Sequence, residues 1–529
     1  MPSRFYDVVV LGRSLGALTA AVLLSRRDFR VLLAGQGQRP QTYRYEGRLL
    51  ARRTFALLSG SSPAFRRMLE ELAQIPQFRR RTQHLDPMFT LLCDGRRIEV
   101  PPDMDLFARE VDREFAEVRQ LVDELYTTVA HVNAGADAAF EREGVWPPAT
   151  LWERLETGRV AYAMPFARGD KGHDLLGKFP RGHAFRELVT VPVEFATHLS
   201  QSSQSSQSAA ELPALALARL HGAWTRGISA LGQSEDGLSE FLMERIEAHG
   251  GVLDLAGKAH SILIKRGRLH GVWLDGADDP LGAGAVISDQ SGEALAELSG
   301  GEGVTRSARR DWPKIGTAAG RFVTSLVVRR ELLPAPLGKI AFVLPKSEGR
   351  RDPRRPIVRL ELLDPLEFPE PHPKAAEELL LVAEMLLPAR GALTLLEARE
   401  AVLSSLREAL PFLDEHLICV DSPHDGLPLY DFESGARREV ERVRLTRAAA
   451  TPEPMERQIS IDRAGYLDLS GEPLRGPIPG TYLVGKTVLP ALGQEGELLA
   501  GASVARIITR KDRARQRMRH QMWSRAETQ

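Results

Sequence analysis

The fold of this chain is decided near its start, by Tyr6-Asp7-Val8-Val9-Val10-Leu11-Gly12-Arg13-Ser14-Leu15-Gly16-Ala17. The apolar, β-branched run that ends at Gly12 is typical of a buried parallel strand. A helical pattern follows over 18–26, and a second strand is expected over 30–34. This order of strand, tight turn, helix and strand predicts the beginning of a nucleotide-binding βαβ unit.

The tight turn carries the three positions that matter for phosphate binding. Gly12 permits the sharp bend, Ser14 stands where the backbone approaches a pyrophosphate, and Ala17 lets the helix pack on the strand. At the end of the second strand, Gly35 occupies the place of the acid that normally binds the adenosine ribose. The motif therefore leaves two interpretations open: a nucleotide cradle that lacks one contact, or a Rossmann-type framework with an empty site.

Length and composition restrict the class of protein. With 529 residues, 43% hydrophobic, the chain can bury large cores in two or three packed units. The 70 basic residues equal the 70 acidic ones, so the overall charge gives no reason to expect a nucleic-acid partner. Cys93 and Cys419 have neither metal-ligand spacing nor a disulfide framework. We expect no metal, and a cytoplasmic protein without an apolar signal core or a membrane span.

Periodicity predicts the remaining elements. A helix should begin at Pro63, a hairpin should form from 88–93 and 97–100, and one long helix is expected over 105–142. The polar repeat over 200–208 is interpreted as a solvated loop, with a lid as the alternative. Further on, we expect a helix over 238–248, strands over 252–255, 259–265, 269–274 and 285–288, and inserted strands over 322–328, 340–344, 357–362 and 379–386.

The C-terminal part of the chain shows the same order of strand, glycine-rich turn and helix as the N-terminal part. A strand is expected over 480–485, and Pro490, Gly493 and Gly496 punctuate a loop before a helix over 497–508. A Gly-rich loop at a helix N-terminus presents backbone amides to an anionic or electron-rich group. The two ends of the chain are therefore expected to meet and form one cradle.

Together, these blocks resemble the phytoene desaturase branch of the amine-oxidase-like flavoproteins. The closing motif of that family is similar to Val-Gly-Lys-Thr-Val-Leu-Pro-Ala-Leu-Gly-Gln-Glu-Gly over 484–496. The resemblance implies an α/β fold, with a Rossmann-like FAD-binding domain of the glutathione-reductase type and an inserted α+β substrate domain. The FAD-binding domain would comprise 1–100, 221–300 and 451–529, and the substrate domain 101–220 and 301–450.

The resemblance also implies FAD as the cofactor and assigns its contacts. The turn would hold the pyrophosphate, Gly35 cannot serve the ribose, and backbone atoms of Ala259 would face the adenine. Arg48 would be a remnant of a motif beside the phosphates, and Lys486 would either pair with the cofactor or point to solvent. The expected cofactor-binding residues are Gly12, Arg13, Ser14, Leu15, Gly16, Ala17, Gly35, Arg48, Ala259, Gly485, Lys486, Gln494, Glu495 and Gly496.

Two functions follow from this resemblance. The first is an FAD-dependent oxidoreductase that desaturates, saturates or isomerises a long apolar substrate, a polyene or lipid-like molecule; no catalytic acid or base is evident in the sequence. The alternative is a catalytically inactive binding or regulatory protein that has lost FAD, as Rab GDP-dissociation inhibitors resemble this fold without redox chemistry. Gly35 and Arg13 favour the alternative, whereas the retained C-terminal glycine loop favours the enzyme.

The basic tail suggests a separate hypothesis. Arginines follow the last expected helix, with Met518, Met522 and Trp523 between them. Such a segment could lie on an anionic membrane surface, which would suit a lipid substrate. The alternative is a solvated helix end whose charges complement the helix dipole.

Overall fold

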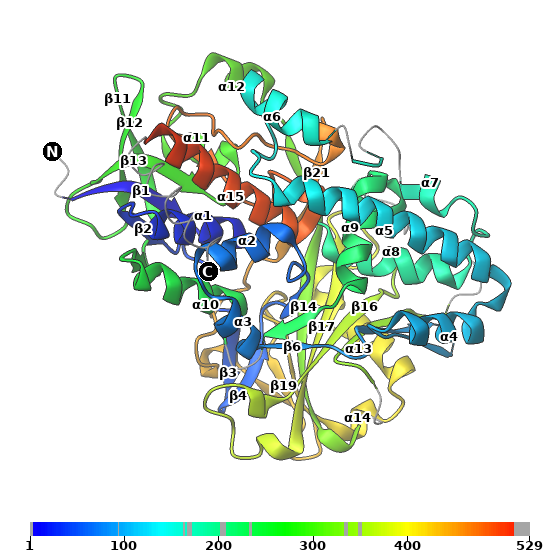
Figure 1. Cartoon of the computed structure of the whole chain (residues 1–529). Helices are drawn as coiled ribbons and strands as arrows, with labels where there is room; N and C mark the ends of the chain where they lie inside the picture. The colour runs from blue at the N-terminus through cyan, green and yellow to red at the C-terminus, as the bar shows by residue number, and fades with distance from the viewer. Residues whose placement is uncertain are drawn as a thin grey trace.

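The computed structural model describes residues 4–93, 95–161, 164–166, 172–200, 208–231, 235–332, 337–346 and 352–512. The tail from Arg513 lies outside the described residues, and so does most of the polar repeat over 200–208. Within the described part, the chain forms one seven-stranded sheet and one ten-stranded sheet, with helices packed against both (Figure 1).

The seven-stranded sheet confirms the predicted Rossmann-like fold. Strand β1 (Phe5–Leu11) pairs in parallel with β2 (Val31–Ala34) on one side and with β13 (Leu281–Ser288) on the other. Val8, Val9 and Val10 are fully buried, as expected for a strand covered on both faces. The other strands are β10 (Val252–Asp254), β11 (Ala259–Lys265), β12 (Arg268–Leu274) and β22 (Thr481–Leu483).

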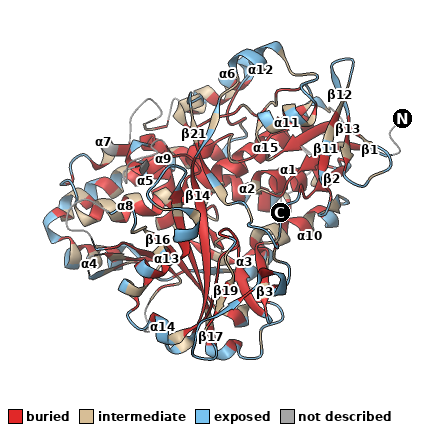
Figure 2. Ribbon diagram, turned by 180° about the vertical axis from the view of Figure 1, so that it is seen from behind, coloured by how far each residue is buried: buried red, intermediate tan, exposed pale blue. Residues whose placement is uncertain are grey.

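Helix α1 (Leu15–Arg26) and helix α15 (Gly493–Lys511) bring the two ends of the chain together. A Cβ at Gly501 would lie 2.4 Å from the carbonyl oxygen of Gly16, so the glycine permits this close crossing. A Cβ at Gly16 would in turn lie 2.0 Å from the carbonyl oxygen of Val484. Figure 1 shows the blue α1 beside the red α15, and Figure 2 shows both helices largely buried. The predicted meeting of the two ends is confirmed.

The ten-stranded sheet forms the core of the second half of the fold. Its strand order is β20-β19-β18-β14-β17-β16-β15-β7-β8, and β21 also pairs with β14. The hairpin β7 and β8 confirms the prediction over 88–100. The bounds are β7 (Phe89–Cys93), β8 (Arg96–Val100), β14 (Ile315–Arg329), β15 (Ile340–Val343), β16 (Val358–Leu363), β17 (Glu378–Pro388), β18 (Leu417–Asp421), β19 (Leu429–Asp431), β20 (Arg438–Val440) and β21 (Glu456–Ile461).

The long helix expected over 105–142 is wrong as a single element. The chain forms α4 (Met104–Glu114), a 3-10 turn at Ala116–Val118, and α5 (Arg119–Glu141). The break occurs at Phe115, whose backbone is not helical (φ −140°, ψ 35°) although its side chain is buried. Buried apolar residues continue through the break, so their spacing could not reveal it.

The remaining helices cover the two sheets. The helix predicted to begin at Pro63 is confirmed as α2, with Ser62 as its N-cap residue, and the helix over 238–248 is confirmed as α10. The bounds are α2 (Pro63–Glu71), α3 (Ile75–Arg81), α6 (Leu151–Ala161), α7 (Gly172–Leu176), α8 (Ala184–Ala196), α9 (Ala214–Thr225), α10 (Gly237–Ala248), α11 (Gly292–Leu298), α12 (Arg306–Asp311), α13 (Leu395–Ala409) and α14 (Leu413–His416).

Short strands connect the two large sheets. A hairpin of β3 (Thr42–Tyr45) and β4 (Arg48–Ala51) follows the Rossmann-like start, and β9 (Ser229–Leu231) pairs with both β5 (Ala56–Leu57) and β6 (Thr82–His84). Among the described helices, none combines the length and the apolar character that a bilayer crossing requires. The division of the chain into an FAD-binding and a substrate domain stays a prediction.

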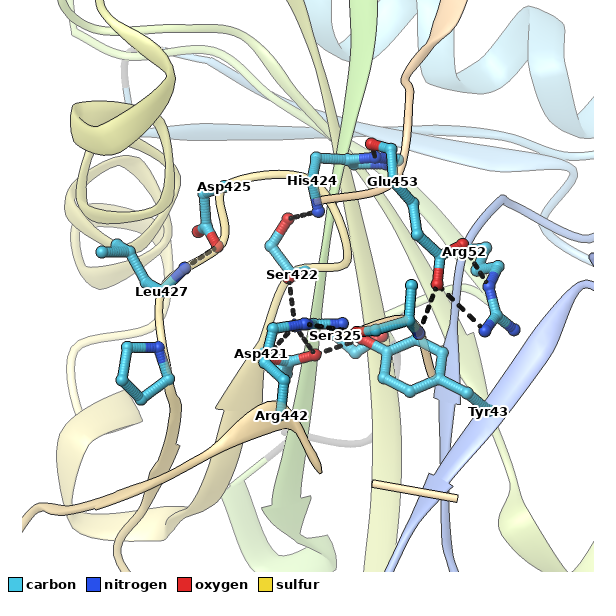
Figure 3. A network of polar contacts seen from close by, with 12 residues as sticks. Tyr43, Arg52, Ser325, Asp421, Ser422, His424, Asp425, Leu427, Arg442 and Glu453 are labelled. Atoms are coloured by element: carbon cyan, nitrogen blue, oxygen red, sulfur yellow. Dashed lines mark hydrogen bonds and ion pairs between the residues drawn. The ribbon is translucent and has the colours of Figure 1, made fainter. Parts of the chain in front are cut away.

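A buried polar network anchors the β3 hairpin to the ten-stranded sheet (Figure 3). The hydroxyl of Tyr43 donates to Asp421 at 2.6 Å, and Arg442 donates to both oxygens of the same carboxylate at 2.9 Å. Nearby, Arg52 donates to Glu453 at 2.7 Å. Since buried charges are stable only when paired, these contacts fix the hairpin's position.

Candidate functional site

The phosphate loop, defined here as residues 12–17, has the expected geometry. Gly12 leaves β1 with φ 108°, a value that favours glycine, and α1 starts three residues later. Ser14 is the N-cap of α1, and its Oγ accepts a hydrogen bond from the amide of Ala17 at 3.3 Å. The loop therefore points backbone amides outward from a helix N-terminus, as an anion site requires.

The chain's own side chains bind these amides. The amide of Ser14 donates to Asp289 Oδ2 at 2.9 Å, and the amide of Arg13 donates to Gln38 Oε1 at 2.8 Å. Gln38 Nε2 also donates to Asp289 Oδ2 at 2.9 Å, which joins the two contacts. Burial raises the pKa of Asp289, against the opposing effect of the hydrogen bonds from Ser14 and Gln38. An internal carboxylate thus lies where the resemblance places the pyrophosphate.

Arg13 points away from this anion site. Its guanidinium forms an ion pair with Asp236, which also accepts a hydrogen bond from the amide of Gln41 at 2.9 Å. Burial, together with the nearby charge of Arg53, lowers the pKa of Arg13 to about 10. Because Arg13 is 6% exposed and paired, its charge is used inside the protein.

The backbone leaves no room for a side chain at Gly35, the position of the ribose acid in the motif. A Cβ at Gly35 would lie 2.1 Å from the carbonyl oxygen of Leu255, and the Gly35 amide donates to Asp254 at 2.9 Å. No side chain can be added at Gly35 without moving the segment after β10. The acidic ribose ligand is therefore excluded by packing as well as absent from the sequence.

The side chain of Gln36 forms hydrogen bonds with the backbone of Ala259, the residue expected to face the adenine. Gln36 lies in the left-handed region (φ 52°), and its side chain is directed at the backbone of Ala259. Gln36 Oε1 accepts from the Ala259 amide at 2.9 Å, and Gln36 Nε2 donates to the Ala259 carbonyl at 3.3 Å. Both backbone groups of Ala259 that would face an adenine are thus bonded within the chain.

The C-terminal loop packs closely against other backbone segments. A Cβ at Gly485 would lie 2.0 Å from the carbonyl oxygen of Asp289, and one at Gly496 would lie 2.2 Å from that of Leu489. The side chain of Gln494 accepts from the amide of Leu58 at 2.9 Å. The glycines that were expected to face a flavin therefore lie against protein.

Glu495 is part of a buried ion pair. Arg219 donates to both of its oxygens, at 2.5 and 2.6 Å. Burial raises the pKa of Glu495, but the Arg219 charge outweighs burial and the net shift is downward. Both side chains are at most 10% exposed, so this pair links α9 to α15 and has no contact to offer a cofactor.

Charged side chains of both signs lie near one another beside the C-terminal glycine segment, where Glu456 acts electrostatically on both Arg53 and Lys486. The side chain of Arg53 is 39% exposed, and partial burial lowers its pKa. Lys486 forms an ion pair with Glu456, and these side chains are 28% and 26% exposed. Burial alone would raise the pKa of Glu456, but the charges of Lys486 and Arg321 outweigh burial, and the net shift is downward. These three side chains therefore interact with one another while each keeps part of its solvent exposure.

A histidine–glutamate pair lies beside these charges, since Lys486 and Glu456 act electrostatically on His198. His198 Nε2 and Glu497 Oε1 are 2.9 Å apart, with both side chains at most 6% exposed. Burial lowers the pKa of His198, against the opposing effect of Glu497. The sequence offered no signal for this pair, because the two residues are far apart in the chain and neither stands in a motif.

Arg48 is not brought to the phosphate loop, which corrects the expectation from the sequence. Its guanidinium lies 3.0 Å from Glu378 and 3.1 Å from Glu433, beside the ten-stranded sheet. The hairpin of β3 and β4 carries Arg48 to this sheet, where two carboxylates neutralise its charge.

The cradle as folded does not fit FAD. An adenine would compete with Gln36 for Ala259, a ribose would find no acid, and a pyrophosphate would meet the carboxylate of Asp289. Like charges at contact distance repel strongly in a buried site. We therefore derive no chemical step through a flavin.

One signal for Asp289 was present in the sequence. Asp289 directly follows β13, and β13 runs parallel to β1. The carboxyl ends of neighbouring parallel strands meet at the edge where the phosphate loop lies. An acid at that position can reach the loop, but this follows only once the parallel pairing of β1 with β13 is known.

Comparisons with known proteins identify the fold. No family model matches the chain, and no curated protein matches it. Among solved structures, it is similar to an oxidoreductase from Methanosarcina mazei, with a TM-score of 0.59 and 16% identity over 94% of this chain and 99% of the other. It is also similar to putrescine oxidase bound to putrescine, with a TM-score of 0.53, and to cyclohexylamine oxidase from Brevibacterium oxydans, with a TM-score of 0.51. Each of these two is 15% identical to this chain, over 96% of this chain and 99% of the other.

At such low identity these similarities show the fold alone. They agree with the Rossmann-like sheet of this chain. They do not single out the phytoene desaturase branch. The chain has the fold of the amine-oxidase-like flavoproteins.

Proposed function

We propose that this chain is a small-molecule-binding or regulatory protein on a flavoprotein fold, and that it works without FAD. One observation supports this proposal: the chain's own groups make the contacts expected of an adenine at Ala259 and exclude an acidic side chain at Gly35. Gln36 bonds both backbone groups of Ala259, and the Leu255 carbonyl fills the space at Gly35. A cofactor would have to break these contacts and would gain no ribose acid in exchange.

The charged cluster of Arg53, Lys486 and Glu456 is the proposed ligand site. These side chains carry charges of both signs and remain accessible to solvent. Charged and hydrogen-bonding side chains favour a small polar ligand, because desolvating them against an apolar molecule would be costly. The long apolar substrate implied by the phytoene desaturase resemblance fits this cluster less well.

Absorbance spectroscopy tests the proposal. The protein purified without added flavin is expected to be colourless, and incubation with FAD followed by desalting should leave no flavin absorbance. Free FAD should also leave the unfolding temperature unchanged, because only a ligand that binds the native state raises it. A yellow protein, or a saturable rise in unfolding temperature with FAD, would overturn the proposal.

The second candidate is an FAD-dependent oxidoreductase. The overall fold favours it, because the similarity to putrescine oxidase and to the Methanosarcina oxidoreductase extends over nearly the whole chain. The close-packed glycines at 485, 493 and 496 are also retained, although the last two lie in the first turn of α15, which begins earlier than the predicted helix over 497–508. Its substrate would be an amine or, following the sequence resemblance, a long apolar molecule. The same spectra decide, since this candidate requires a bound flavin that the substrate bleaches.

A further inference from the structure

Asp289 has a position that neither the sequence motif nor the comparisons assign. Its backbone and side chain lie between the two glycine loops at the ends of the chain. A Cβ at Gly12 would lie 2.0 Å from Asp289 Oδ1, and a Cβ at Gly485 would lie 2.0 Å from the Asp289 carbonyl oxygen. Both glycines therefore make room for this one residue.

The carboxylate makes the contacts that a phosphate would make. Its Oδ2 accepts hydrogen bonds from the Ser14 amide and from Gln38 Nε2, both at 2.9 Å. Gln38 in turn accepts from the Arg13 amide at 2.8 Å. The two loop amides are satisfied, and a negative charge lies at the N-terminus of the twelve-residue helix α1.

We propose that Asp289 is an intramolecular substitute for a cofactor phosphate, which closes the anion site of the phosphate loop to external phosphates. This inference builds on the proposed function, in which FAD is absent. It adds that the anion site itself is intact and is blocked by one side chain. Removal of that side chain should reopen it, because the loop amides and the α1 dipole would then lack a partner.

The test measures diphosphate binding by Asp289→Ala and by the wild-type protein, both free of flavin. We expect the wild type to bind no diphosphate, and Asp289→Ala to bind it saturably, with at least a tenfold gain in affinity by titration calorimetry. Gln290→Ala truncates the neighbouring side chain, which forms no hydrogen bond with residues 12–17, and should behave like the wild type. Equal binding by wild type and Asp289→Ala, or none by a folded Asp289→Ala, would overturn the inference.

A second variant and a second measurement keep the test decisive if the alanine variant does not fold. Asp289→Asn keeps an oxygen for the Ser14 amide but removes the charge, so it should fold and bind diphosphate more tightly than the wild type. In the wild type, hydrogen exchange at the Arg13 and Ser14 amides should be slow without any added anion. Fast exchange at both amides would also contradict the inference.

The two proposals fail separately. Flavin absorbance in the wild type would contradict the proposed function, whereas the diphosphate titration uses flavin-free protein and reports only on Asp289. A colourless wild type with an unresponsive Asp289→Ala would leave the proposed function standing and remove the inference.

Discussion

Gly12 keeps the conformation that a nucleotide-binding motif requires, but the carboxylate of Asp289 lies against it. The sequence predicted that Gly12 bends the chain out of β1, and its φ of 108° confirms this. The sequence could not show that the space above it is filled by a carboxylate, because Ser14 and Asp289 are 275 positions apart. A local motif specifies backbone geometry, whereas the occupant of the site depends on long-range pairing.

His221 makes the stability of the protein depend on pH. Its ring is fully buried, with Nε2 2.9 Å from the hydroxyl of Tyr126, and among the described residues none forms a hydrogen bond with Nδ1. Burial lowers its pKa from 6.5 to about 4. Because the unfolded chain binds the proton more readily, the contribution of neutral His221 is complete above about pH 6.5 and is lost as pH falls toward about 4, by up to about 3 kcal/mol.

The measurement compares urea unfolding of the wild type and His221→Gln across this pH range. The variant should lose less of its free energy of unfolding on acidification than the wild type does. His260→Gln, at an exposed position, serves as the control and should follow the wild type. Parallel pH profiles for wild type and His221→Gln would contradict the assignment.

At the scale of elements, periodicity predicted what is local and missed what is not. The strands of the Rossmann-like sheet, α2 and α10 were predicted from apolar spacing and start signals, and they formed as expected. The break at Phe115 was missed because the apolar period continues through the 3-10 turn. The pairing of Gln36 with Ala259 was missed because it joins two elements.

The crossing of α1 and α15 depends on Gly501. A methyl group there would lie 2.4 Å from the Gly16 carbonyl oxygen and 2.9 Å from Thr19 Cβ. Helix propensity alone would favour alanine by up to about 1 kcal/mol. Overpacking against backbone should dominate, so Gly501→Ala should lower the free energy of unfolding by at least about 2 kcal/mol.

The matched control for this prediction is Gly158→Ala in α6. Within the part of the chain that the structure describes, nothing lies within 4 Å of the position that its Cβ would take. This substitution should stabilise the protein slightly, by up to about 1 kcal/mol. Chemical denaturation of both variants measures the change in the free energy of unfolding, which should be negative for Gly501→Ala and slightly positive for Gly158→Ala. If Gly501→Ala were as stable as Gly158→Ala, the crossing would not be limited by backbone contact.

At the scale of the whole molecule, the sequence predicted that the two ends of the chain form one structure. This was possible because each end carries its own strand, glycine turn and helix. The contents of the cradle could not be predicted in the same way. They depend on Gln36, Gln38 and Asp289, which are ordinary polar residues in sequence and acquire their roles only when β1, β2 and β13 are adjacent.

The charge of the molecule is balanced as a whole but not along its length, because basic residues are concentrated at the C-terminal end. The segment 513–529 holds five arginines and one acidic residue, while the described fold ends at Asp512. Near an anionic membrane, each basic residue contributes about 1 kcal/mol, screened by salt. We therefore expect the full chain to bind phosphatidylserine vesicles at low salt and a chain truncated after Asp512 not to bind. A full-length variant with the five arginines replaced by glutamine separates charge from length, and unchanged binding by that variant would exclude an electrostatic contact.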